Sequence, residues 1–81
     1  MESIQVLFFA GLRERFGDRH QVAWEEGLTV EGLLNRLHET YPDLAPFLKG
    51  TMIAVNEAYA ARDTSLHPGD QVAIIPPVSG G

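Results

Sequence analysis

The stretch TVEGLLNRLHETYP, residues 29–42, predicts one long helix, and this helix decides the fold. Thr29 is a favourable N-cap, and Glu31 lies in the first turn, where the helix dipole stabilises a negative charge. The apolar residues recur in a single stripe at Val30, Leu33, Leu34, Leu37 and Tyr41. Pro42 ends the helix after Tyr41, because proline disfavours the helical conformation of the residue before it. The stripe is therefore expected to pack on a sheet.

Five segments around this helix have strand character. The apolar, β-prone segment 4–10 is expected to be the first strand and segment 71–75 the last. Shorter strands are expected at 19–24, 52–55 and 58–61, with a helical turn at 11–16 and turns at 56–57 and 67–70.

The order of these elements is β, β, α, β, β, β. Because the first and last strands are the most apolar, we expect them side by side and parallel in the centre of the sheet. This arrangement predicts an α+β protein of the β-grasp type, in which a mixed sheet wraps around one long helix. A split βαβ sandwich is the alternative, but it needs a second long helix.

The C-terminal segment PPVSGG, residues 76–81, is expected to form a tail separate from a domain over residues 1–75. Pro76 and Pro77 end the last strand, since proline has a fixed φ and no backbone donor. The chain beyond them should protrude as an extended arm. Gly80 and Gly81 leave the terminal carboxylate without a nearby Cβ, so that an enzyme can approach it closely. We therefore expect the Gly81 carboxylate to be reactive; an incidental frayed terminus is the alternative.

Composition excludes several classes of function. The 81 residues include no cysteine, so disulfides, thiolate nucleophiles and cysteine metal sites are excluded. Six basic and eleven acidic residues give a net charge of −5, which argues against a nucleic-acid partner. The apolar run 6–12 is too short for a signal peptide or a membrane span, so no membrane association and a cytoplasmic location are expected.

No residue pattern suggests catalysis by this chain alone. His20, His38 and His67 lack partners at metal-ligand spacing, so no metal site is expected, and they are interpreted as surface or loop residues. A Ser-His-Asp arrangement and a glycine-rich phosphate loop are also missing from the sequence.

The sheet is expected to be apolar on both faces. If Ile4, Val6, Phe8, Val72 and Ile74 point at the helix, then Leu7, Phe9, Ala73 and Ile75 point away from it. Met52 or Ala54, together with Tyr59, can extend this second apolar patch. Such a patch at the base of the tail predicts a docking surface; the alternative is that flanking loops cover it.

Several of these segments together resemble a known family, the small subunits of molybdopterin synthase, which are ubiquitin-like sulfur carriers. The segments that carry the resemblance are Val6-Leu7-Phe8-Phe9-Ala10, Leu12-Arg13-Glu14, Thr29-Val30-Glu31, Ala54-Val55-Asn56, Gly69-Asp70-Gln71-Val72-Ala73 and Pro76-Pro77-Val78-Ser79-Gly80-Gly81. They cover almost the whole chain in the expected order, and the ending is the most specific of them.

The resemblance implies a mechanism for the tail. An ATP-dependent adenylyltransferase of the ubiquitin-activating type would adenylate Gly81, and a persulfide-based sulfur donor would convert it to a thiocarboxylate. The loaded tail would enter the synthase large subunit and give sulfur to cyclic pyranopterin monophosphate, building the dithiolene of molybdopterin. This chain would bind no cofactor itself, and the catalytic residues would lie on the large subunit.

The resemblance also implies residue roles. Gly80 would provide clearance at Gly81, while Phe9, Tyr59 and Ile75 would dock the partner, with weak electrostatic help from Arg13. Pro76, Pro77, Val78 and Ser79 would direct the tail into the partner's channel. A heterotetramer of two small and two large subunits is implied as well.

Other functions fit the same ending. A thiamine- or tRNA-type sulfur carrier would share the fold and the terminal glycines. A ubiquitin-like protein modifier would use the same adenylate to join Gly81 to lysine side chains. A plain interaction module would tolerate changes at both glycines.

Overall fold

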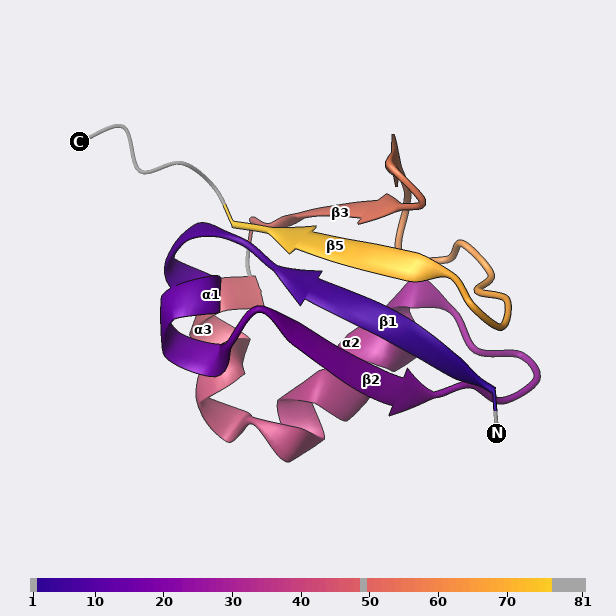
Figure 1. Ribbon diagram of the computed structural model, residues 1–81, viewed down its shortest axis with the longest axis horizontal. Helices are drawn as coiled ribbons and strands as arrows, with labels where there is room; N and C mark the ends of the chain where they lie inside the picture. The colour runs from indigo at the N-terminus through magenta and orange to yellow at the C-terminus, as the bar shows by residue number, and fades with distance from the viewer. Residues whose placement is uncertain (1, 49, 77–81) are drawn as a thin grey trace.

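The computed structural model describes residues 2–48 and 50–76. Five strands form one mixed sheet in the order β2-β1-β5-β3-β4, with α2 behind it in the view of Figure 1. The elements in chain order are β1 (Ser3–Phe8), α1 (Ala10–Phe16), β2 (Arg19–Ala23), α2 (Val30–Thr40), the 3-10 helix η1 (Pro42–Leu44), α3 (Ala45–Leu48), β3 (Met52–Val55), β4 (Ala58–Tyr59) and β5 (Gln71–Ile75). This is the β-grasp arrangement predicted from the order of elements.

The first and last strands lie side by side in the sheet. β1 and β5 pair in parallel, with Gln5 opposite Gln71 and Phe8 opposite Ile74. β2 pairs with β1, and β3 with β5, both antiparallel. The predicted parallel pairing of the two most apolar strands is confirmed.

The core lies between the sheet and α2. The Thr29 side chain accepts a hydrogen bond from the Gly32 amide at 3.2 Å and so caps the helix. The buried side chains of α2 are Val30, Leu33, Leu34 and Leu37. They face the inward residues of β1 and β5, which are Ile4, Val6, Phe8, Val72 and Ile74, each at most 1% exposed. The inner sheet face is confirmed, and so is the stripe at these four helix positions; Tyr41, the predicted fifth member, is the half-buried C-cap residue that follows α2.

Local boundaries differ from the predictions where the chain reverses sharply. The first strand ends at Phe8, because Ala10 adopts a positive φ of 52° and turns the chain into α1. The turn predicted at 11–16 is a seven-residue helix that buries Leu12, so the fold holds α1 and the short α3 besides α2. The strands predicted at 19–24 and 58–61 end earlier, at Ala23 and Tyr59.

His20 is not the surface residue that the sequence suggested. Its ring is half-buried, 5.0 Å from the Phe8 ring centroid and 5.2 Å from that of Tyr41. Its Nε2 lies 2.6 Å from the Phe16 carbonyl oxygen, and its Nδ1 lies 2.9 Å from the Tyr41 hydroxyl. Since a carbonyl only accepts, Nε2 donates to the Phe16 carbonyl, and Nδ1 shares the second hydrogen bond with the Tyr41 hydroxyl. His20 therefore joins α1, β2 and the end of α2.

Candidate protein-docking site

The face of the sheet that α2 does not cover carries apolar side chains. Along β1 and β5, Leu7, Ala73 and Ile75 alternate with the inward residues and so lie on this outer face. Residues opposite one another in the register share a face, which adds members from β3 and β4. The apolar members of the outer face are Leu7, Phe9, Met52, Ala54, Tyr59, Ala73 and Ile75.

Three large side chains of this face are open to solvent. Phe9 is 42% exposed, Met52 is 50% exposed and Tyr59 is 72% exposed. The alternative that flanking loops cover the patch is wrong for these three residues. Clustered exposed apolar side chains mark interaction sites more often than isolated ones do. The face therefore has the character of a protein-docking surface.

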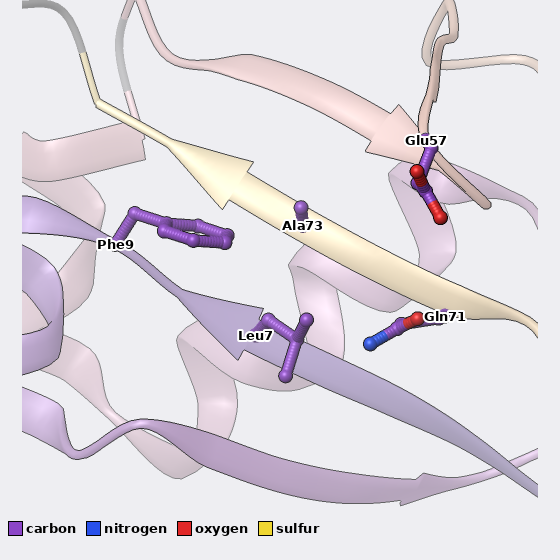
Figure 2. A pocket seen from close by; sticks show the side chains of 5 residues that line it. All are labelled: Leu7, Phe9, Glu57, Gln71 and Ala73. Atoms are coloured by element: carbon purple, nitrogen blue, oxygen red, sulfur yellow. The ribbon is translucent and has the colours of Figure 1, made fainter.

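A shallow hollow of about 250 Å³ opens in the middle of this face (Figure 2). The Phe9 ring stands at one end, and Leu7 and Ala73 line the part between the two central strands. Glu57 and Gln71 stand at the other end. The hollow is thus apolar over most of its length and polar at one end.

The polar end is built by the turn between β3 and β4. Asn56 and Glu57 both adopt positive φ angles, 50° and 71°. The Asn56 amide donates to Asp70 Oδ1 at 3.0 Å, and its Oδ1 accepts from the Gln71 backbone amide at 3.0 Å. These bonds tie the turn to β5, next to the hollow.

Asp70 anchors this network from the loop before β5. Burial raises the pKa of its carboxyl, but the hydrogen bonds from the His67 backbone amide and the Asn56 side chain, with the nearby His67 ring, outweigh burial. The pKa of Asp70 therefore lies below its ordinary value. The charged Asp70 carboxylate accepts the hydrogen bond from Asn56 and so holds the turn between β3 and β4 in place.

A second hollow of about 220 Å³ adjoins the first on the β2 side and shares Leu7 and Phe9 with it. Arg13, Asp18 and Arg19 contribute its charged lining, and Arg13 Nε lies 3.5 Å from Asp18 Oδ1. The two sides of the outer face therefore differ in charge.

The predicted site residues are only partly within the described chain. Phe9, Tyr59 and Ile75 lie on the outer face as expected. Pro76 follows β5 directly and is half-exposed. Pro77, Val78, Ser79, Gly80 and Gly81 lie outside the described residues, and so does the predicted protrusion of the tail.

Within 2–48 and 50–76, no group of three or more metal-ligating side chains is placed to hold an ion. His20 uses both ring nitrogens in the hydrogen bonds described above. None of the helices in these ranges is long and apolar enough to cross a membrane.

Two lining residues were not recognised in the sequence as part of the site. The sequence predicts Glu57 as a turn residue, and it predicts Gln71 as the start of a strand and a member of a segment that carries the family resemblance. A signal existed for Gln71, since it shares the alternation of Ala73 and Ile75. The position of Glu57 over the hollow depends on how the hairpin pairs with β5, which local periodicity does not give.

Comparison with known proteins agrees with this architecture. The ThiS family matches residues 6–81. The chain is 36% identical to the molybdopterin synthase sulfur carrier subunit of Mycobacterium tuberculosis, with both chains covered completely.

Two solved structures are similar over nearly their full lengths. SAMP1 from Haloferax volcanii has a TM-score of 0.87 at 28% identity, covering 98% of this chain and 99% of that one. A putative molybdopterin converting factor, subunit 1, from Pyrococcus furiosus has a TM-score of 0.85 at 26% identity, covering 96% and 100%. With its ubiquitin-like β-grasp fold and a match that spans residues 6–81, the chain belongs to the ThiS family, and it resembles the molybdopterin synthase sulfur carrier subunits over its whole length.

Proposed function

We propose that the chain is a sulfur carrier in molybdenum cofactor biosynthesis and acts as the small subunit of molybdopterin synthase. The observation that carries this proposal is the exposed apolar outer face, which adjoins the strand that leads into the C-terminal segment. A partner seated on Phe9, Tyr59 and Ile75 would meet the chain where it leaves β5 at Pro76. The similarity to a sulfur carrier subunit over the complete chain supports the same role.

In this proposal residues 1–75 are the docking domain and residues 76–81 are the reactive tail. A carboxylate oxygen of Gly81 attacks the α-phosphorus of ATP on an activating adenylyltransferase, and pyrophosphate leaves. A persulfide sulfur then attacks the activated carbonyl carbon and AMP leaves. Reductive cleavage of the sulfur–sulfur bond by a thiol leaves a thiocarboxylate on Gly81. ATP is consumed by the activating enzyme, and no cofactor is bound by the carrier.

The loaded tail then enters the large subunit of the synthase. Its sulfur passes to cyclic pyranopterin monophosphate, and a second loaded carrier supplies the other sulfur of the dithiolene. Pro76, Pro77, Val78 and Ser79 line the partner's channel, and Gly80 leaves room around the reactive carbon. The residues that act on the pterin belong to the large subunit, and this chain is the sulfur-donating part.

Intact-mass measurement tests the proposal. The chain is incubated with the activating enzyme, ATP and a sulfur source, and its mass is expected to rise by the difference between sulfur and oxygen. A variant that lacks Gly81 is the matched control: it should keep the urea midpoint of the parent and gain no mass. A truncated chain that still delivers sulfur to the pterin would refute the role of Gly81.

Immunoblots, added to the mass measurement, distinguish a protein modifier from a sulfur carrier. Both functions use the Gly81 adenylate, but a modifier forms an amide bond with lysine side chains of other proteins. Conjugates of higher mass on immunoblots, together with an absence of thiocarboxylate, would assign the chain to protein modification.

A further inference from the structure

The acidic end of the hollow on the outer face has no ion-pair partner among residues 2–48 and 50–76. Glu57 is exposed, lines the hollow and forms no ion pair with any residue in 2–48 or 50–76. Figure 2 shows its carboxylate on the same side of the sheet as the Gln71 amide, beyond Leu7 and Ala73. The net charge of the chain is −5, which is already far enough from zero to favour solubility. Solubility therefore does not explain an acid at this one position.

The positive φ of Glu57 makes a glutamate at this position unusual. Glutamate at φ 71° occupies a conformation that favours glycine, and within the described part of the chain its side chain makes no hydrogen bond like those that hold Asn56. The two-residue turn between β3 and β4 requires a positive φ at both central residues, so the conformation itself is explained by the turn. The turn favours glycine at this position and does not require a carboxylate there.

The opposite side of the outer face carries the other sign of charge. Arg19 lies opposite Leu7 in the β1–β2 register and lines the second hollow. It forms no ion pair among the described residues, whereas Arg13 is close to Asp18. The sheet order places β2 and β4 at opposite edges, so the apolar face lies between an acid and a base that form no ion pair with any described residue.

We propose that Glu57 binds a basic side chain, arginine or lysine, of the protein that docks on the outer face. The aliphatic stem of that side chain lies along Leu7 and Ala73, and its charged head bonds the Glu57 carboxylate and the Gln71 amide oxygen. Long basic side chains combine an apolar stem with a charged end, which matches a hollow that is apolar along its length and acidic at one end. This inference rests on the proposed function, since that function supplies the docked protein.

The charge arrangement also fixes the orientation of the partner. A basic side chain placed at the Arg19 side would be repelled, and one placed at Glu57 is attracted. A partner that fits the apolar face in two orientations by shape is thereby held in one. Glu57 is a specificity-determining contact and takes no part in sulfur chemistry.

Binding measurements with matched charge variants test this role. The wild-type chain, Glu57→Gln, Glu57→Lys and Glu39→Gln are titrated into the purified synthase large subunit of the same organism, at about 0.05 M and 0.5 M salt. Glu39→Gln removes one negative charge from an exposed position on α2, on the other side of the sheet, and serves as the control.

Glu57→Gln is expected to weaken binding about tenfold at low salt, as loss of a charge-assisted hydrogen bond predicts. The difference from wild type should shrink at high salt, and Glu57→Lys should bind more weakly than Glu57→Gln. Glu39→Gln should bind like wild type. Urea midpoints of all four chains show whether a change in binding comes from a change in folding.

The inference and the proposed function fail in different ways. If Phe9→Ala loses binding while Glu57→Gln binds like wild type at both salt concentrations, the docking function stands and the role of Glu57 is refuted. If the wild-type chain does not bind the large subunit, the proposed function fails and this inference fails with it. A wild-type dimer in sedimentation that Glu57→Gln abolishes would identify a second copy of the chain as the occupant and would also overturn the inference.

Discussion

Replacing Glu57 by glycine is expected to stabilise the fold, although it removes a side chain from the docking face. Glu57 lies at φ 71°, where a residue with a Cβ costs about 1–2 kcal/mol relative to glycine. Glycine also makes the unfolded chain more flexible, which offsets about 0.5–1 kcal/mol. The midpoints of the two ranges leave a net gain in the free energy of unfolding of roughly 0.75 kcal/mol.

The neighbouring residue provides the matched comparison. Asn56 has a similar φ of 50°, but its side chain bonds Asp70 and the Gln71 amide, each at 3.0 Å. Asn56→Gly relieves the same kind of backbone cost and loses two hydrogen bonds, worth about 0.5–1.5 kcal/mol each. We therefore expect opposite signs at adjacent positions: Glu57→Gly stabilises and Asn56→Gly destabilises.

Urea unfolding followed by tryptophan fluorescence measures both effects. Trp24 is the single tryptophan, and its indole donates to the Leu66 carbonyl at 2.7 Å, so its emission reports the folded state. With a slope of about 1 kcal/mol per molar urea, Glu57→Gly should raise the midpoint by about 0.5–1 M.

Glu57→Ala is the control for charge, since it removes the carboxylate and keeps the backbone cost. It is expected to leave the midpoint unchanged or slightly lower. If Glu57→Ala stabilises as much as Glu57→Gly, the gain comes from lowering the negative charge, and the argument from φ is refuted. A Glu57→Gly chain that unfolds at lower urea than wild type would refute it as well.

Three further predictions address the two faces of the sheet, the helix cap and the dependence of stability on pH. Phe8→Ala should cost about 3–5 kcal/mol in urea unfolding, because Phe8 is 1% exposed, whereas Phe9→Ala should cost about 1 kcal/mol or less and abolish partner binding in calorimetry. Thr29→Ala should lower the free energy of unfolding by about 1 kcal/mol, since the Gly32 amide loses its side-chain acceptor; Thr29→Ser should retain most of it. The lowered pKa of Asp70 stabilises the fold at pH values above 3.8, the ordinary pKa of the group, and this stability is lost as the pH falls through the lower pKa of the folded state. Asp70→Asn should therefore be less stable than wild type at neutral pH. In acid unfolding below the folded pKa, the difference between the two chains should disappear.

Much of the fold could be predicted because its local signals agree with one another. The bounds of β3 and β5 are those expected, since turn residues bracket each apolar run. The cap at Thr29 and the stop at Pro42 delimit α2 in the same way. The parallel pairing of β1 and β5 followed from the apolar character of the two strands.

The differences arise where distant residues decide the outcome. The end of β1 could not be placed because it depends on a positive φ at Ala10, a residue type that rarely adopts one. The burial of His20 depends on Tyr41, which lies 21 positions further along the chain. The hollow between Phe9 and Glu57 likewise exists only once the hairpin is paired with β5.

The central position of β5 has a mechanical consequence. This strand is hydrogen-bonded to β1 on one side and to β3 on the other, and it is the strand that continues into Pro76 (Figure 1). Tension applied at Pro76 along the strand axis acts on both ladders in shear, so that many backbone bonds share the load at once. If the strand were instead peeled from an edge of the sheet, its hydrogen bonds would break one after another. A partner can therefore pull on this end of the chain without unravelling the domain that carries it.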